Sequence, residues 1–180
     1  PTAEQLKMLR RRRQIEFQDP SGALNPRMTV ADTIIEHLRV QGWSRADARS
    51  QAAAAFDQCG LHSGLFTRYP HENSGGQRQR AVIARAISTD PAFIVADEPV
   101  SALDVSTRAQ IMNLLRDIQK ARGLTMLFIS HDLSVVAHMC RQVAVMYLGR
   151  IVEMAPREAL FRAPLHHYTA ALMSAIPIPD

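Results

Sequence analysis

The sequence predicts an α/β protein with a mostly parallel sheet flanked by helices and an additional helical lobe. Short, wholly apolar runs appear at residues 92–97 and 124–130, with a helical pattern between them. This strand–helix–strand order favours a parallel sheet joined by right-handed crossovers. Residues 29–59 show helical patterns only, which indicates a separate helical region.

The first ninety residues are predicted to be mostly helical. "QIEF" (14–17) is compatible with a strand, and residues 29–40 and 45–59 are predicted to be helices. Ser44 precedes the second helix and Asp47 follows three residues later, which resembles a capping box with Asp in place of Glu or Gln. We therefore expect a helical lobe inserted before the sheet resumes at residue 92.

The run at 92–97 (AFIVAD) predicts a strand buried on both faces, because it contains no polar residue before its last position. A helix is expected over 104–121, ended by Gly123. Its apolar residues fall at helical spacing: Ile111, Leu114, Leu115 and Ile118. Residues 124–130 predict a second buried strand.

The remaining elements are predicted from the same patterns. The run at 142–148 is expected to extend the parallel sheet as a third strand. The others are a helix at 132–141, a fourth strand at 150–154 after a turn at Gly149, and short helices near 156–162 and 166–175. The prolines of the final "IPIPD" end regular structure.

Composition places the chain among soluble globular proteins. It has 180 residues, 47% of them hydrophobic and 21% charged, and no apolar run approaches the ~20 residues of a membrane span. Cys59 and Cys140 lie far apart without a C-x-x-C, which favours two buried free thiols over a disulfide framework or metal site. The net charge of +4 is compatible with nucleic acid, an acidic membrane or a phosphorylated ligand, although a run as short as Arg10–Arg13 is usually a solvated helix face.

Two neighbouring predicted strands end in polar side chains. Asp97 and Glu98 follow the first strand, and Ser130, His131 and Asp132 follow the second. In open α/β sheets ligands bind at the carboxyl ends of strands. Adjacent carboxylates suit a divalent cation together with a group that orients water, as in phosphoryl transfer. Each motif alone could be polar only because it reaches solvent, but their joint placement favours a site.

The stretch "NSGGQRQR" (73–80) predicts the opening of a helix that receives an anion. Ser74 is a good N-cap, and Gly75 and Gly76 let the backbone approach a ligand. Free N–H groups and the positive end of the helix dipole would face the same point. "SGG" alone fits an ordinary glycine turn, whereas its combination with the two strand ends favours phosphate binding.

Taken together, these residues resemble the ATP-binding subunits of ABC transporters, which implies a P-loop NTPase-like fold. Five motifs carry the resemblance, in the family's order and spacing. They are "FQDP" (17–20) for the Q-loop, "NSGGQ" (73–77) for the signature, "FIVADEP" (93–99) for Walker B with its glutamate, "SALD" (101–104) for the D-loop and "ISHD" (129–132) for the switch histidine.

The resemblance implies ATP and Mg²⁺ as ligands. Asp97 would hold Mg²⁺, Glu98 would polarise the attacking water, and His131 would contact the γ-phosphate. Gln18 would sense Mg²⁺ and the γ-phosphate and link to membrane subunits.

The resemblance also implies an interface with a second ATPase subunit. Four signature residues would clamp the γ-phosphate of ATP bound on that partner: Ser74, Gly75, Gly76 and Gln77. Asp104 would pack across the same interface, and the helical lobe would dock on membrane subunits.

The C-terminal "PLHHYTAALMSAIPIPD" resembles importers of dipeptides and oligopeptides, with nickel and glutathione importers nearby. This implies an identical or paralogous ATPase partner, transmembrane permease subunits and, indirectly, a substrate-binding protein. It also implies a position at the cytoplasmic face of a bacterial inner membrane, and no nucleic acid is expected.

Two departures from the family pattern are present. Asn73 stands where the family usually has leucine or phenylalanine, and no G-x-x-x-x-G-K-[ST] (Walker A) occurs in the 180 residues. Since that loop lies upstream of the Q-loop in the family, and the chain begins at Pro1, we expect a fragment that is inactive alone. Exposed sheet edges and self-association are expected for it.

Four segments are expected in this fragment: the end of the N-terminal core with the Q-loop (1–20), the helical signature subdomain (21–90), the catalytic core (91–155) and a C-terminal helical extension (156–180).

Two alternatives remain open. A nucleic-acid-associated ABC ATPase of the repair or ribosome type fits the basic charge, but long heptad insertions and a tandem second cassette are not found in this sequence. A non-catalytic remnant is opposed by the intact Asp97, Glu98 and His131.

Overall fold

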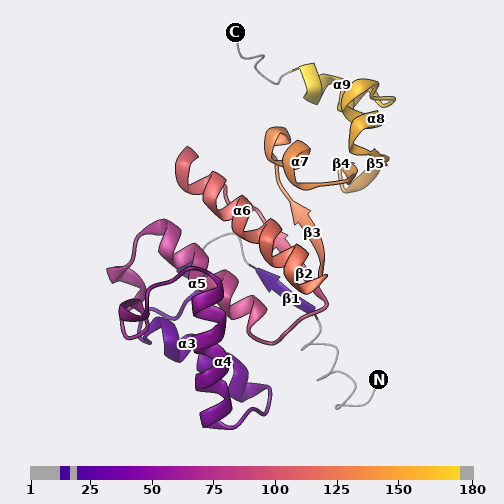
Figure 1. Ribbon diagram of the computed structural model, residues 1–180. Coiled ribbons are helices and arrows are strands. Elements are labelled where there is room, and N and C mark those ends of the chain that lie inside the picture. Colours follow the sequence, from indigo (N-terminus) through magenta and orange to yellow (C-terminus); the bar gives the residue numbers. More distant parts are fainter. Residues whose placement is uncertain (1–12, 17–19, 175–180) are drawn as a thin grey trace. The chain divides into compact units, whose positions relative to one another are not determined.

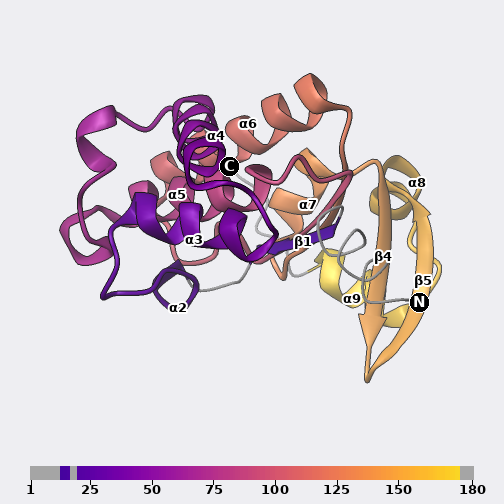
Figure 2. The same ribbon diagram turned by 90° about the horizontal axis from the view of Figure 1, so that it is seen from below.

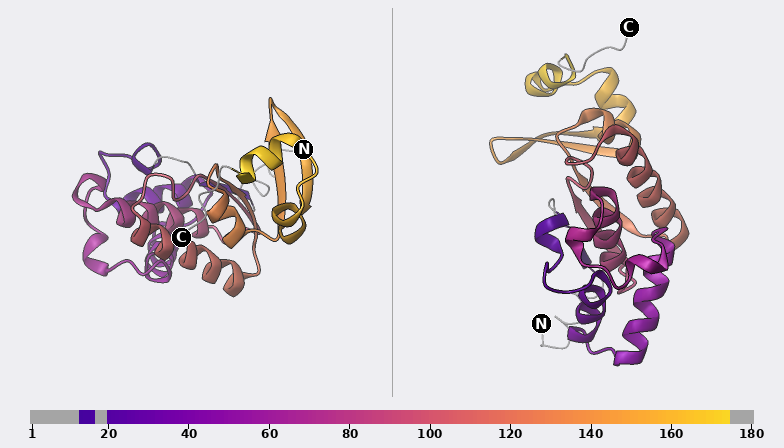
Figure 3. Two further views of the ribbon diagram at one scale, coloured as in Figure 1. Left: turned by 90° about the horizontal axis from the view of Figure 1, so that it is seen from above. Right: turned by 90° about the vertical axis from the view of Figure 1, so that its left-hand side faces the viewer.

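The computed structural model describes residues 13–16 and 20–174 and divides at Ile129/Ser130 into two compact units (Figures 1 and 3). The predicted Q-loop residue Gln18 and the "IPIPD" tail lie outside the described residues. Among the described helices, none combines the length and apolarity needed to cross a membrane.

The first unit contains a parallel sheet, which confirms the predicted α/β class. Within the described residues it has the strands β1 (Arg13–Glu16), β2 (Phe93–Asp97) and β3 (Thr125–Ile129), in the order β1-β2-β3. The parallel register aligns Ile15 with Val95, and Asp97 with Ile129. Strand β1 thus pairs with a strand nearly eighty residues later in the sequence. The whole helical lobe is inserted between these two neighbouring strands.

The prediction that β2 and β3 are buried on both faces is wrong. Along β2, Ile94 and Ala96 are buried while their neighbours are half-buried, and β3 alternates between exposed and half-buried positions. Leu127 and Ile129 remain 50% and 43% exposed. Strand β3 forms an edge of the described sheet, and its alternation of exposed and half-buried residues indicates that one of its faces has little cover in the described part of the chain. This exposed apolar edge agrees with the expectation from sequence.

The lobe consists of α2 (Pro20–Ala23), α3 (Val30–Val40), α4 (Arg45–Gln58), two short 3₁₀ turns (Ser63–Leu65 and Pro70–Glu72) and α5 (Gly75–Ile87). Figure 2 shows α3, α4 and α5 side by side, and their buried residues form most of the core of this part. The predicted cap of α4 is confirmed, because the Ser44 hydroxyl accepts a hydrogen bond from the Asp47 backbone N–H at 3.1 Å. That hydroxyl also donates to the Asp47 carboxylate at 2.7 Å.

Helix α6 (Val105–Arg122) begins and ends as the sequence predicts. Asp104 is its N-cap, and Gly123 follows its last residue with φ of +61°, in the left-handed region that glycine adopts without strain. The apolar stripe of α6 is buried: Ile111, Leu114, Leu115 and Ile118.

The second unit contains α7 (Leu133–Met139), β4 (Gln142–Tyr147), β5 (Arg150–Pro156), α8 (Arg157–Arg162) and α9 (His167–Ser174). Figure 2 shows the β4–β5 hairpin with the two C-terminal helices beside it. Its core comprises Val136, Val143, Val145 and Leu160.

The prediction that the third strand extends the parallel sheet is wrong within the described residues, where β4 pairs only with β5 and is antiparallel to it. The turn at Leu148 and Gly149 explains this pairing. Both residues have positive φ, 47° and 77°, the conformation of a two-residue hairpin turn. The chain therefore returns directly along β4.

The two cysteines differ in burial. Cys59 is buried as predicted, but Cys140 is only half-buried, and neither forms a disulfide in the described part of the chain. Burial raises the pKa of the Cys140 thiol above its usual value.

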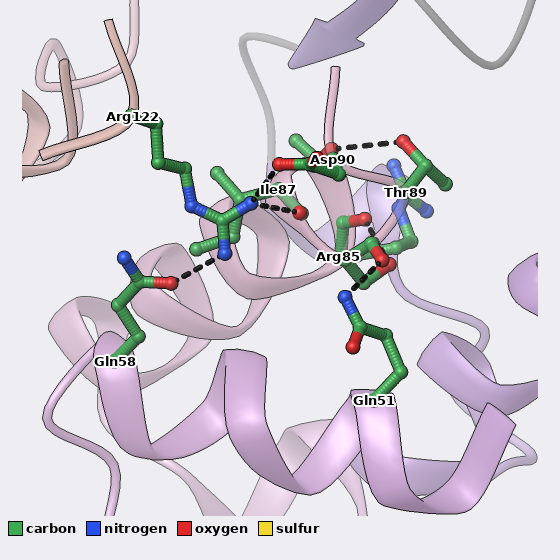
Figure 4. A network of polar contacts seen from close by, with 9 residues as sticks. Gln51, Gln58, Arg85, Ile87, Thr89, Asp90 and Arg122 are labelled. Atoms are coloured by element: carbon green, nitrogen blue, oxygen red, sulfur yellow. Dashed lines mark hydrogen bonds and ion pairs between the residues drawn. The ribbon is translucent and has the colours of Figure 1, made fainter. Parts of the chain in front are cut away.

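A polar network fastens the lobe to the end of α6 (Figure 4). The Arg122 guanidinium donates to the backbone oxygen of Ile87 at 2.9 Å and to the Asp90 carboxylate at 3.0 Å, and it also reaches the Gln58 side chain on α4. From the same helix, the Gln51 amide donates to the backbone oxygen of Ser88 at 2.9 Å. Because the free carbonyls at the end of α5 need donors, this network satisfies them and joins α4, α5 and α6.

We predict that Arg122→Ala lowers the free energy of unfolding by about 1–2 kcal/mol, since a side chain only 18% exposed loses several hydrogen bonds at once. Lys120→Ala, at an exposed position of the same helix, is the matched control and should change it by less than about 0.5 kcal/mol. Urea unfolding of both variants measures this, and equal losses would contradict the anchoring role.

Candidate functional site

The acidic pair lies at the carboxyl end of β2, as predicted. Asp97 is the last residue of the strand and Glu98 follows it, both half-buried. Glu98 has φ of +49°, in the left-handed region that non-glycine residues rarely adopt. Its backbone N–H donates to the oxygen of Ile129 at 2.9 Å, which holds this conformation at the end of β3. Such locally strained backbone is found preferentially at functional sites.

The chain after Glu98 folds into a tight turn that leads to α6. The backbone oxygen of Glu98 accepts hydrogen bonds from the Ser101 N–H at 3.2 Å and the Ser101 hydroxyl at 3.1 Å. The turn ends at Asp104, whose carboxylate accepts from the Thr107 N–H at 2.9 Å and from the Thr107 hydroxyl at 2.7 Å. These bonds, led by the one from the backbone N–H, lower the pKa of Asp104. Asp97, Glu98 and Asp104 therefore belong to one continuous, internally bonded segment.

The opening of α5 has the N-cap serine and the two leading glycines that the sequence predicts. Ser74 is the N-cap, and its hydroxyl accepts from the Gln77 N–H at 3.3 Å. The Gln77 side-chain oxygen accepts from the Ser74 N–H at 2.9 Å, which completes a capping box. Gly75 and Gly76 form the first two helical positions, where the backbone N–H groups have no intrahelical acceptor. A partial positive charge therefore faces outward from this half-exposed helix end.

Asn73, the departure from the family pattern, is buried immediately before this helix. Its amide donates to the backbone oxygen of Tyr69 at 2.9 Å, and its own backbone oxygen accepts from the Arg78 guanidinium at 2.7 Å. Its side-chain oxygen is buried and has no hydrogen-bond partner among the described residues. The substitution thus occupies a packing position behind the glycines and leaves the Ser74 cap intact.

The structure brings the α5 opening against the start of α6. A methyl group built on Gly75 would lie 3.7 Å from the Leu103 side chain, and one on Gly76 would lie 2.6 Å from the Thr107 γ-methyl. The predicted signature residues and Asp104 are therefore neighbours within one chain. Sequence reasoning missed Thr107, although a Thr three residues after an Asp N-cap is a recognisable local signal.

His131 follows β3, as predicted, and belongs to the second unit. Beside it the Ser130 hydroxyl accepts from the Asp132 N–H at 3.0 Å. Asp132 is the N-cap of α7 and accepts from the Ser134 N–H at 3.0 Å. Asp132 thus has a local structural role in the segment that carries the histidine.

An open groove of about 600 Å³ lies on the lobe, along α3 and beside the start of α4. Four arginines and two carboxylates line it, which leaves a charge of +2: Arg27, Arg39, Arg45, Arg49, Asp32 and Glu36. Apolar side chains complete the lining, including Val40, which is 79% exposed. The sequence predicts that this lobe docks on membrane subunits, but it did not identify these residues. The pair Arg45 and Arg49, one helical turn apart, was the available signal.

Family comparison gives two matches along this chain. Residues 1–101 match the family model described as ABC transporter. Residues 152–180 match the family model of the C-terminal region of oligopeptide/dipeptide transporters. The chain belongs to the ABC transporter family. The second match covers most of β5 and all of α8 and α9, and it includes the C-terminal stretch that resembles peptide importers in sequence.

Relatives support this membership over nearly the full chain. A Brucella ovis protein named for peptide import and ATP binding is 54% identical over an alignment of 180 positions that covers 99% of this chain and 57% of that protein. The oligopeptide transport ATP-binding protein OppF of Bacillus subtilis is 51% identical over 172 residues, 94% of this chain and 56% of OppF. The chain therefore spans little more than half the length of these relatives.

Solved structures share the fold. CbiO1 of Clostridium perfringens, part of the ABC transporter complex cbiONQ, is 27% identical with a TM-score of 0.79 over 90% of this chain and 64% of its own. A dimeric ATP-binding cassette in a post-hydrolysis state, bound to ADP and phosphate, is 27% identical with a TM-score of 0.73 over 87% of this chain and 68% of its own. The predicted class, a P-loop NTPase-like ABC ATPase fold, is thus confirmed.

Beside α3, a smaller pocket of about 380 Å³ contains His37, which burial and the nearby Arg85 charge keep neutral. These two causes lower the pKa of His37 from 6.5 to about 4. The Gln41 side-chain nitrogen lies 3.1 Å from its Nε2, a bond that neutral imidazole can accept. Glu36 on the same helix also lines this pocket.

We predict that the chain loses stability as the pH falls from about 6.5 to about 4, because the unfolded chain binds a proton at His37 before the folded chain does. The contribution is fully present above pH 6.5. Urea unfolding at pH 7.5 and 5.0 should show a smaller decrease for His37→Gln than for the wild type. Equal decreases in the two proteins would contradict this assignment.

Proposed function

We propose that this chain is part of an ATP-binding and ATP-hydrolysing subunit of an ABC importer that couples hydrolysis to the uptake of peptides or a related small solute. One observation carries the proposal: a single chain matches both the ABC transporter family and the C-terminal region of oligopeptide/dipeptide transporters. In this proposal the chain has four segments with separate roles: 1–20, 21–90, 91–155 and 156–180.

The end of β2 would carry the hydrolytic chemistry. Asp97 and Glu98 present two half-buried carboxylates at a strand end, a donor set suited to Mg²⁺ and to a water molecule. In this proposal Asp97 holds Mg²⁺, which would neutralise charge on the phosphates. Glu98 accepts a hydrogen bond from the attacking water and so orients it toward the γ-phosphate. The bonded left-handed turn at Glu98 would fix the direction of its side chain.

The other site residues would bind the nucleotide. His131 contacts the γ-phosphate, and Gln18 senses Mg²⁺ and the γ-phosphate. On the opposite side of a nucleotide held by a second ATPase subunit, the α5 opening supplies the clamp, formed by Ser74, Gly75, Gly76 and Gln77. Unpaired helix N–H groups favour this role because they bind phosphate oxygens without a charged side chain. Asp104 lies at the same proposed interface between subunits.

The lobe groove is the proposed contact with the permease. Its net positive charge and exposed apolar residues fit a cytoplasmic helix that carries acidic and apolar side chains. Binding there would place the subunit peripherally at the cytoplasmic face of the inner membrane, next to a permease served by a substrate-binding protein.

We predict that the 180-residue chain alone shows no steady ATP hydrolysis, since its sequence contains no G-x-x-x-x-G-K-[ST]. Phosphate release by the purified chain measures this. Turnover that Glu98→Gln abolishes would contradict it.

In the protein translated from its complete reading frame, Glu98→Gln should lower kcat by about 10²-fold or more, as expected for loss of a group that activates water. Glu158→Gln, at an exposed carboxylate of α8, is the control and should leave kcat unchanged. Equal kcat values for wild type and Glu98→Gln would remove Glu98 from the mechanism.

For the groove, we predict that the double variant Arg45→Glu, Arg49→Glu reduces co-purification with the permease about tenfold, because it reverses the charge of one wall. Arg162→Glu changes an exposed arginine outside the groove and should have no effect. Undiminished co-purification of the double variant would exclude this surface.

A further inference from the structure

The two glycines at the α5 opening are not equivalent in this structure. A methyl on Gly75 would make an ordinary contact, 3.7 Å from Leu103. On Gly76 it would lie only 2.6 Å from the γ-methyl of Thr107, closer than carbon atoms approach without displacement. Gly76 is therefore required by packing within the chain, whereas Gly75 has room for a side chain or for a ligand.

The Thr107 side chain cannot easily turn away from Gly76. Its hydroxyl donates to one Asp104 carboxylate oxygen at 2.7 Å, and its backbone N–H donates to the other at 2.9 Å. A β-branched residue has few χ1 rotamers, and this pair of bonds selects one. The γ-methyl is thereby directed at Gly76 and fixes how closely the two helix starts approach.

We infer that Thr107 is a positioning residue that ties the α5 opening to Asp104, so that Ser74, Gly75 and Gly76 keep a fixed position relative to the start of α6. Its functional consequence rests on the proposed function, in which the α5 opening and Asp104 act at the same interface between subunits. Asp104 then acts within its own chain, as the residue that orients Thr107, as well as toward a partner subunit.

A double-mutant cycle in the 180-residue chain tests the packing. Gly76→Ala should lower the melting temperature by about 5 °C, the scale of an overpacked contact in a domain of this size. Gly75→Ala makes the same chemical change one residue earlier and should shift it by less than about 2 °C. Adding Thr107→Ser to Gly76→Ala removes the clashing methyl, keeps the hydroxyl and should restore most of the loss.

Two results of this cycle would overturn the inference: Gly76→Ala as harmless as Gly75→Ala, or no recovery in the Gly76→Ala, Thr107→Ser double variant. Both are independent of nucleotide and of the proposed function.

Amide hydrogen exchange separates positioning from a general loss of stability. Thr107→Ser alone should accelerate exchange about tenfold at Gln77 and Arg78, whose N–H groups donate to Ser74, because the γ-methyl no longer fixes the α5 opening, and leave residues 82–87 of the same helix unchanged. Uniform acceleration along α5 would mean that Thr107 only adds stability.

Activity links the contact to the proposed function. In the protein from the complete reading frame, Gly76→Ala should lower the ATPase kcat at least tenfold, and the added Thr107→Ser should restore it. Low kcat in both variants would overturn the functional part of the inference. A wild-type protein without ATPase activity would instead refute the proposed function, while the melting and exchange results would still decide the packing.

Discussion

The pairing of β2 with a strand on each side is the constraint on which the first unit depends. Strand β1 precedes the helical lobe and β3 follows α6, yet both align with β2 residue by residue. Because backbone N–H and C=O groups of a strand need partners, the lobe must leave the sheet at one strand and return at its neighbour. The hydrogen-bonded core thus determines where the lobe is attached, and the Arg122 network secures the far end of α5.

At the carboxyl end of β2 the backbone is locally strained and is held in place by hydrogen bonds. Glu98 adopts a left-handed conformation that costs free energy, and the Ile129 and Ser101 hydrogen bonds hold it there. Without them the segment would relax, and the directions of Asp97 and Glu98 would no longer be defined. The same bonded turn continues to Asp104 and, through Thr107, to the start of α5. The end of β2, Asp104 and the start of α5, which have separate roles in the proposed reaction, are therefore connected by direct contacts.

The second unit is stabilised by different interactions from those of the first unit. Its hairpin closes through a two-residue turn with positive φ at Leu148 and Gly149, and its core is small. Glu153 on β5 supports the last helix, since its carboxylate accepts from the N–H groups of Leu165 and His166 at 2.9 and 3.0 Å. These bonds, the Leu165 bond first, lower the pKa of Glu153. Within the segment that matches oligopeptide/dipeptide transporters, the start of α9 is thus joined to β5 by hydrogen bonds to a charged side chain and not by burial alone.

The sequence alone determined most of what depends on local rules. The helix starts at Ser44 and Ser74 and the stop at Gly123 followed from cap chemistry, which involves residues only a few positions apart. The cap that Asp104 forms with Thr107 is equally local but was not predicted. The order and spacing of the motifs were enough to predict the family. Only the tertiary structure decided which strands pair, how exposed β3 is, and that Gly76 meets Thr107 thirty-one residues later. Such contacts depend on how separate elements approach in space, and no local periodicity encodes that distance.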